Sequence, residues 1–210
     1  MAIVDDLREA VIEGQSKVAV TRVTEGLEAG VAASELLQEG LIAGLQRVGQ
    51  LFEGGEVYVP EMLVSARAMS AALAVLKPYL VAQDVKAGGK VAIGTVQGDM
   101  HDIGKNLVAM MLEGSGYEVV DLGVDVPPEK FIQAIRDGAN VVAMSALLTT
   151  TMTNMPITIE AIREAGLRER ARIVIGGAPI TKSYADEIGA DGYASDASSA
   201  TRLVAEILAT

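Results

Sequence analysis

The spacing of apolar residues changes near the middle of this 210-residue chain. From Ile3 to about Gln83, apolar residues recur every three or four positions, which is the period of a helix that buries one face. Pro60 stands where a proline can begin a helix without strain. Four such helices with short connections predict a small antiparallel bundle. Their expected ranges are 3–13, 16–29, 32–53 and 60–83.

The second half alternates short runs rich in Val and Ile with helical segments, and Pro127-Pro128 begins one of these helices. Strands that alternate with helices are typical of a parallel sheet covered on both faces. The segment 82–89 breaks both patterns and predicts a hinge-like linker, so we expect domains at 1–84 and 88–210. The predicted strands cover 90–96, 117–123, 140–146, 172–177 and 192–195, and a last helix covers 198–209.

Composition narrows the classes of function. The net charge of -11 argues against nucleic acid or an anionic membrane as a partner, because both require clustered Lys and Arg. Cysteine is absent, which excludes disulfides, thiolate metal sites, iron–sulfur clusters and cysteine nucleophiles. The N-terminus is acidic where a signal peptide would be basic, and no uncharged apolar run approaches the roughly 20 residues that span a bilayer. We therefore expect a cytoplasmic protein.

Ligands of parallel α/β sheets bind beyond the carboxyl ends of the strands, near the point where the strand order reverses. We therefore expect functional residues after the first, third and fourth strands. The loop after the first strand, Gly98–Asn106, is not a Walker A loop, because five residues separate Gly98 from Gly104-Lys105 and because Asn106 stands where Ser or Thr would bind Mg²⁺. Its glycines also lack the spacing of a dinucleotide-binding fingerprint.

His101 is the only histidine in the chain, and Asp99 and Asp102 flank it. An imidazole that binds a metal usually donates its other N–H to a carboxylate, and Asp99 is placed to accept it. One histidine without cysteine cannot build a zinc site, so a metal at His101 would need a macrocyclic cofactor that leaves an axial position to the protein. On spacing alone, a lone histidine in such a loop is more often a surface residue or a helix cap, and a general base oriented by Asp99 is about as plausible as a metal ligand.

The segment Gly98–Asn106 resembles the D-x-H-x-x-G motif of the cobalamin-binding family, in its longer G-D-x-H-D-I-G-K-N form. Two further landmarks of that family follow in order, Ser145-Ala146-Leu147 after the third strand and Gly176-Gly177 after the fourth. The helical half resembles the cap of methyl-transferring members over 52–61 and 65–67. The resemblance implies an α/β protein with an N-terminal four-helix bundle cap and a flavodoxin-like (Rossmann-type) five-stranded parallel sheet domain. It also implies cobalamin or a related corrinoid, with its cobalt, as the cofactor.

The histidine of that family replaces the cofactor's own dimethylbenzimidazole as the lower ligand of cobalt. The resemblance therefore implies that His101 is the metal ligand, that Asp99 accepts its second N–H, and that the hydroxyl of Thr151 completes a proton relay. These three are the expected catalytic residues. Methionine synthase-like members carry serine at the position of Thr151.

The resemblance also implies which other residues contact the cofactor. Ser145 and Thr149 would line the slot for the nucleotide tail, and three glycines would let the tail pass close to the backbone. Phe52 and Val59 of the cap would cover the upper face of the corrin, where the family often has leucine at the second position. The three glycines are Gly104, Gly176 and Gly177, and the remaining expected contacts are Gly98, Met100, Asp102, Ile103 and Leu147.

The function implied by the resemblance is that of a corrinoid methyl carrier. A substrate-specific methyltransferase would move a methyl group onto Co(I), and a second methyltransferase would pass it from methyl-Co(III) to tetrahydrofolate or a thiol coenzyme. A reductive activator is the third expected partner. Cap and corrinoid domain account for all 210 residues, so we expect no complete reaction by this chain alone.

Two alternatives belong to other classes of protein. The cobalamin-binding subunit of a mutase shares the histidine motif but typically lacks the helical cap. An adenosylcobalamin-dependent regulator typically carries Trp and a second His in its cap, whereas this chain has no Trp and one His. A methyl group as the upper ligand supports the carrier, and an adenosyl group supports either alternative.

Overall fold

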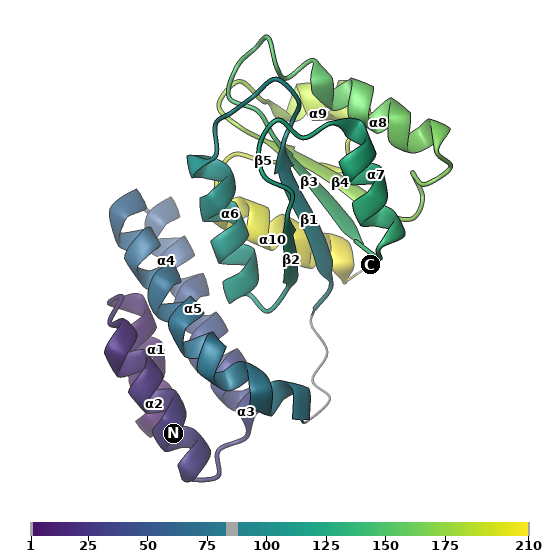
Figure 1. Cartoon of the computed structure of the whole chain (residues 1–210). Coiled ribbons are helices and arrows are strands. Elements are labelled where there is room, and N and C mark those ends of the chain that lie inside the picture. The colour runs from purple at the N-terminus through teal and green to yellow at the C-terminus, as the bar shows by residue number, and fades with distance from the viewer. Residues whose placement is uncertain (1, 83–87, 210) are drawn as a thin grey trace. The chain divides into compact units, whose positions relative to one another are not determined.

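The computed structural model describes residues 2–82 and 88–209 (Figure 1). The chain divides into a helical unit, Met1–Ala87 with Met110–Gly116, and an α/β unit, Gly88–Ala109 with Tyr117–Thr210. Most of the predicted linker, residues 83–87, lies outside the described residues.

The helical unit contains the helices that the apolar spacing predicts. Its third helix is continuous, with a π-helical segment, η1, between α3 and α4. The sequence does not predict this segment, because one wider turn hardly changes the average apolar spacing. Arg8 of α1 donates a hydrogen bond from Nε to the carbonyl of Glu39 in η1, at 2.8 Å. The bounds are α1 Ala2–Ile12, α2 Ser16–Glu28, α3 Ala33–Glu35, η1 Leu36–Ile42, α4 Ala43–Glu53 and α5 Val59–Ala82.

The long helix α5 supplies much of the core of the helical unit. Within the described residues, Val59–Leu80 is the one segment long and apolar enough to span a membrane, by length and composition alone. Met62, Met69 and Leu76 of this helix are fully buried, and their spacing of seven residues places them on one face. The packing of the bundle therefore accounts for part of the apolar character of α5.

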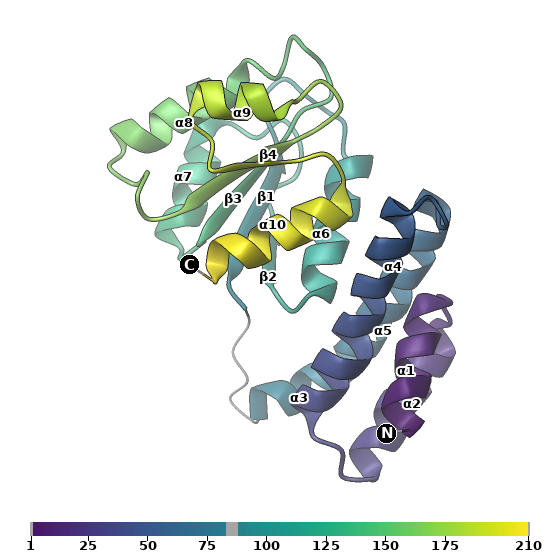
Figure 2. The ribbon, with the colours of Figure 1, turned by 180° about the vertical axis from the view of Figure 1, so that it is seen from behind.

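The α/β unit is built on one parallel sheet with the strand order β2-β1-β3-β4-β5. This is the flavodoxin-like order, which reverses between β1 and β3, and it confirms the predicted fold class. Helices α7, α8 and α9 cover one face of the sheet, and α6 and α10 cover the other (Figure 1 and Figure 2). The strands are β1 Lys90–Thr95, β2 Glu118–Asp121, β3 Val141–Ser145, β4 Arg172–Gly176 and β5 Gly192–Ala194. The helices are α6 Ile103–Gly114, α7 Pro128–Arg136, α8 Asn154–Glu164, α9 Lys182–Ile188 and α10 Ala197–Leu208.

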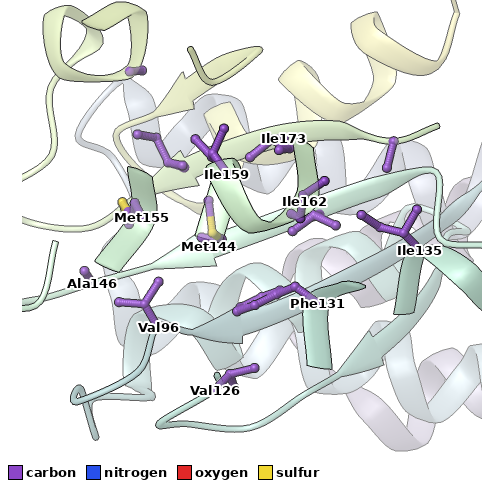
Figure 3. Packing of buried hydrophobic residues seen from close by; sticks show 14 of the residues in the cluster. Val96, Val126, Phe131, Ile135, Met144, Ala146, Met155, Ile159, Ile162 and Ile173 are labelled. Atoms are coloured by element: carbon purple, nitrogen blue, oxygen red, sulfur yellow. The ribbon is translucent and has the colours of Figure 1, made fainter. Parts of the chain in front are cut away.

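Figure 3 shows the apolar core between the sheet and the helices α7 and α8. Phe131 of α7 is fully buried there. Gly94 of β1 leaves room for its ring, since a Cβ at Gly94 would lie 3.0 Å from Phe131 Cζ. Met144, Met155 and Ile159 pack in the same cluster. A chain poor in aromatic residues thus fills this layer with Met and β-branched side chains around one fully buried ring.

Candidate functional site

The carboxyl ends of four strands lie side by side at one edge of the sheet. Thr95 of β1 is in register with Ser145 of β3, Ser145 with Gly176 of β4, and Gly176 with Ala194 of β5. Because parallel strands point the same way, the loops that follow them leave from this common edge. The loops after β1 and β3, which are far apart in the sequence, therefore meet.

Asp99 lies at the centre of this meeting point and is 1% exposed. Its Oδ1 accepts hydrogen bonds from the backbone N–H of His101 at 3.0 Å and from His101 Nδ1 at 2.7 Å. Its Oδ2 accepts hydrogen bonds from the backbone N–H of Leu147 at 2.8 Å and from Thr151 Oγ1 at 2.6 Å. Four donors thus surround one buried carboxylate, which matches the accepting capacity of its two oxygens.

The charge of Asp99 decides the tautomer of His101. Burial by itself would raise the pKa of Asp99, but hydrogen bonds from Thr151, from the backbone of His101 and Leu147, and from the imidazole hold it well below its usual range. An ionised carboxylate can only accept, so Nδ1 of His101 must carry the hydrogen. Nε2 then keeps its lone pair, and the His101 side chain is half exposed. The site therefore presents one imidazole nitrogen that can bind a metal.

The loop that carries His101 is anchored by residues that the sequence reasoning missed. The buried hydroxyl of Thr95 donates to the carbonyl of His101 at 2.8 Å, and Asn154 Nδ2 donates to the carbonyl of Gln97 at 2.7 Å. From the loop after β2, Asp125 contacts the backbone at two points, through its own N–H and through its carboxylate. The expectation named the loops after strands 1, 3 and 4 only. Asp125 could have been suspected from the strand order, because β2 is the other neighbour of β1.

Exposed apolar side chains gather close to His101, in the loops after β1 and β3 and at the first residue of α6. Met100 is 68% exposed and Ile103 is 79% exposed, and in the loop after β3 Leu147 and Leu148 are 43% and 44% exposed. Among the described residues of the α/β unit, these are four of the five exposed large apolar side chains. We call these four residues the apolar rim. Such clustering marks a surface that a ligand or partner covers.

The three glycines expected at the nucleotide tail differ in what surrounds them. Gly177 has a φ of +132°, and a Cβ there would lie 1.9 Å from the carbonyl oxygen of Ala146. A Cβ at Gly176 would lie 2.9 Å from the carbonyl oxygen of Ala194. The protein's own backbone therefore requires both glycines. A Cβ at Gly104 would meet no atom within 4 Å, so among these three only Gly104 has a missing side chain that the protein's own packing does not explain.

The other residues expected near the tail take different places at this edge. Ser145 is half-buried at the end of β3, Thr149 is exposed in the loop that follows, and Gly98 has a φ of +82° in the loop after β1. Asp102 is exposed and bonds Asn106 of α6 rather than His101.

Lys105, which was not among the expected site residues, is buried. Its Nζ contacts both carboxylate oxygens of Asp121, at 2.6 and 2.7 Å. This ion pair ties α6 to the end of β2, and Asp121 also accepts a hydrogen bond from the backbone N–H of Gly123 at 2.8 Å.

The two expected cap residues belong to the other unit. Phe52 is half-buried in the last turn of α4, and Val59 is 40% exposed at the first position of α5. The α/β unit by itself thus brings together Asp99, His101 and Thr151 but not these two side chains.

The donor set restricts what kind of metal site this can be. Among the residues that the structure describes, no group of three or more His, Asp or Glu side chains could hold a metal ion. A metal at His101 would therefore take its other ligands from a cofactor. One free imidazole nitrogen inside an apolar rim fits a flat macrocycle that lacks one axial ligand. The fold and the site define a protein that carries such a cofactor.

Comparison with known proteins shows which cofactor-binding family this is. Families described as B12 binding domain match residues 89–202 and residues 3–77. The chain belongs to this family of B12-binding corrinoid proteins, and its cofactor is cobalamin or a related corrinoid.

The similar proteins cover nearly the whole chain. Trimethylamine corrinoid protein 1 of Methanosarcina acetivorans is 39% identical over 209 residues, which are 98% of this chain and 97% of that protein. Dimethylamine corrinoid protein 1 of Methanosarcina mazei is 40% identical over 208 residues, 98% of this chain and 96% of that protein. The crystal structure of the methanol:cobalamin methyltransferase complex MtaBC from Methanosarcina barkeri has a TM-score of 0.85 at 28% identity. The structural similarity covers 99% of this chain and 80% of the matched chain in that complex.

Proposed function

We propose that this protein is the methyl carrier of a multi-component methyltransferase system, with His101 as the lower ligand of its corrinoid. The observation that supports this most is the hydrogen-bonded chain from Thr151 through Asp99 to His101, which leaves Nε2 free inside the apolar rim. When bound, the corrinoid supplies a cobalt centre that accepts a methyl group from one partner and gives it to another.

The residues beneath the cofactor would control the proton that competes with cobalt for His101. With the corrinoid held through Nε2, Asp99 would keep the hydrogen on Nδ1 of His101, and Thr151 would donate to the other carboxylate oxygen. The ionised Asp99 would also pair with the imidazole in its protonated form. The strength of axial ligation would thus follow the protonation of this chain of three residues.

The surrounding residues would bind and shield the cofactor. The apolar rim would pack against the lower face of the ring and exclude water from His101. Ser145, Thr149 and the open position at Gly104 would line the slot for the nucleotide tail. In the helical unit, Phe52 and Val59 would cover the upper face, a role consistent with the second family match over residues 3–77.

The similar proteins suggest what the partners act on. Two of them are named for trimethylamine and dimethylamine, and a third is part of a methanol:cobalamin methyltransferase complex. We infer that the first partner is a methyltransferase for a small methylated amine or alcohol. A second methyltransferase that serves tetrahydrofolate or a thiol coenzyme, and a reductive activator, would complete the system. We also propose that this system works in the cytoplasm. The proposed domains of the chain are residues 1–84 and 88–210.

Isotope labelling tests the axial ligand directly, because the chain has one histidine. The protein labelled with ¹⁵N-histidine is reconstituted with unlabelled cobalamin and reduced to Co(II). Coordination by His101 predicts that the nitrogen splitting in the electron paramagnetic resonance spectrum changes from a triplet to a doublet. In His101→Ala the splitting from the protein should disappear. A triplet that persists in the labelled protein would show that the cofactor's own base is the ligand, and this proposal would fail.

A further inference from the structure

Asp125 adopts a backbone conformation that side chains rarely take. It lies in the loop between β2 and α7 with a φ of +51°, and it is the one residue other than glycine with a positive φ among the described residues. Such a conformation is unfavourable for an L-residue, although Asp and Asn tolerate it better than most. Backbone strain of this kind persists where the surrounding contacts hold the residue in place, so Asp125 should have such contacts.

Asp125 contacts the main chain of the His101 loop at two points. Its backbone N–H donates to the carbonyl of Asp99 at 2.9 Å, and its Oδ1 accepts from the backbone N–H of Gly98 at 2.7 Å. The next residue, Val126, is fully buried and donates from its backbone N–H to the carbonyl of Thr95 at 3.0 Å. Asp125 is therefore held by the core on one side and holds the His101 loop on the other.

These two hydrogen bonds act on the two sides of the Asp99 α-carbon. The N–H of Gly98 precedes Asp99, and the carbonyl of Asp99 follows it, so together they fix the direction in which the Asp99 side chain leaves the backbone. The carboxylate at the end of that side chain receives Nδ1 of His101. The contacts of Thr95 and Asn154 fix the loop at residues 101 and 97 instead, on either side of this point.

We propose that Asp125 is a positioning residue for His101, which it orients through the backbone of Gly98 and Asp99; this inference rests on the proposed role of His101 as the cobalt ligand. The hydrogen bonds of Asp125 go to the N–H of Gly98 and the carbonyl of Asp99, not to the imidazole or to the carboxylate of Asp99. Its effect on axial ligation is indirect and passes through one peptide segment.

Two substitutions separate the contributions of Asp125, and a third serves as their control. Asp125→Asn keeps an accepting Oδ1 and tolerance of the left-handed conformation but removes the charge. Asp125→Gly favours the backbone conformation but removes the acceptor. Asp137→Gly is the matched control, since Asp137 is an exposed aspartate in the same unit whose carboxylate bonds Gln133.

The first measurement is the ratio of histidine-ligated to unligated Co(II) in the reconstituted full chain, by electron paramagnetic resonance with ¹⁵N-histidine. We expect Asp125→Gly to lower this ratio about tenfold, as for the loss of one hydrogen bond, and Asp125→Asn to keep it within about twofold of wild type. The second measurement needs no cofactor. Amide hydrogen exchange of Gly98 in the apo-protein should accelerate in Asp125→Gly, while that of residues in β3 should not change.

The labelled wild-type protein, measured beside these variants, distinguishes two failures. If it keeps the triplet of the cofactor's own base, the proposed function fails and the role of Asp125 fails with it. If it shows the doublet of His101 but Asp125→Gly keeps the wild-type ratio, only the role of Asp125 is overturned. An equal loss in Asp125→Asn and Asp125→Gly would also overturn it, because charge rather than the hydrogen bond to Gly98 would then be responsible.

Discussion

Thr151 Oγ1 donates a hydrogen bond of 2.6 Å to Oδ2 of Asp99, across 52 positions of sequence. Both groups are buried, Asp99 at 1% and Thr151 at 7% exposure. The contact joins the loop after β1 to the loop after β3, at the point where the strand order reverses. The same carboxylate orients His101 from its other oxygen. A substitution of Thr151 should therefore change both the stability of the protein and the orientation of the His101 imidazole.

The hydroxyl of Thr151 should contribute measurably to the stability of the apo-protein. Thr151→Ala removes one donor from a buried carboxylate, and we expect the free energy of unfolding to fall by about 1.5–3 kcal/mol. Thr151→Ser keeps the donor and loses only a methyl group, for which about 0.8 kcal/mol is expected. Urea unfolding of the three proteins checks this. Equal losses in the two variants would show that the hydroxyl contributes nothing.

Asp99→Asn should be more damaging than Thr151→Ala. An amide accepts through one oxygen only, so its NH₂ group must face either the donors from His101 or those from Leu147 and Thr151. The hydrogens of the NH₂ group then point at other hydrogen-bond donors in a buried place. We expect lower stability than in Thr151→Ala and, by the proposed mechanism, a methyl-transfer rate with a partner methyltransferase reduced at least tenfold. Transfer at the wild-type rate in a folded Asp99→Asn protein would eliminate the proton relay.

Two glycine substitutions should separate the requirements of the fold from those of the cofactor. Gly177→Ala forces a Cβ to 1.9 Å from the carbonyl oxygen of Ala146, so we expect a loss of more than about 3 kcal/mol in apo-protein stability. Gly104→Ala meets open space in the first turn of α6, where alanine favours the helix by up to about 1 kcal/mol. The apo-protein should therefore keep its stability.

Cofactor binding gives the second half of that comparison. If the nucleotide tail passes Gly104, Gly104→Ala should weaken binding of hydroxocobalamin about tenfold or more, as followed by absorption during titration of the apo-protein. Unchanged affinity would remove Gly104 from the proposed tail slot and would leave the rest of the site untouched.

The N-terminus of α10 should make stability depend on acid pH. Burial alone would raise the pKa of Asp196, but hydrogen bonds from Ser199, Ser195 and Ser198 lower it further than burial raises it. Because the folded pKa lies below the unfolded value of about 3.9, the ionised group stabilises the fold above that value. The contribution is lost as pH falls through the folded pKa.

Asp196→Asn tests this contribution without removing the cap, since asparagine also caps helices. At neutral pH we expect the variant to unfold more easily by about 0.5–1 kcal/mol, because it lacks a negative charge at the helix N-terminus. The two proteins should converge in stability as the pH falls below about 4. Denaturant midpoints of both proteins, measured across this pH range, test the prediction. A difference between the two midpoints that stays constant with pH would show that ionised Asp196 does not stabilise the fold.

The positions of most helices and strands could be predicted from the sequence. The strands expected at 90–96 and 140–146 are observed as β1 (Lys90–Thr95) and β3 (Val141–Ser145), and α5 begins one residue from its expected start. The family was visible in the motif around His101. The pairing of Asp99 with His101 was also within reach, since two residues in one loop are close whatever the rest of the fold does. These are local properties.

Other features of the site could not be predicted in this way. The π-helical segment η1 changes the hydrogen bonding of a helix without changing which residues are apolar. Gly177 is expected to serve the nucleotide tail, and the structure adds a second reason for glycine there, because a Cβ would meet the carbonyl oxygen of Ala146. Asp125 lies after a strand that we did not expect to contribute, and its partners are backbone atoms that no residue pattern reveals.

By itself, the sequence determined the helices and strands, the single histidine and the absence of cysteine. Together with the family motif, one histidine without cysteine limited the cofactor to one that brings most of its own metal ligands. Periodicity and composition carry that information because each depends on neighbouring residues only. The tertiary structure alone decided which loops meet at His101 and which backbone groups hold it. Those contacts depend on strand order and register, because these bring residues 95, 99, 125 and 151 together from separate parts of the chain.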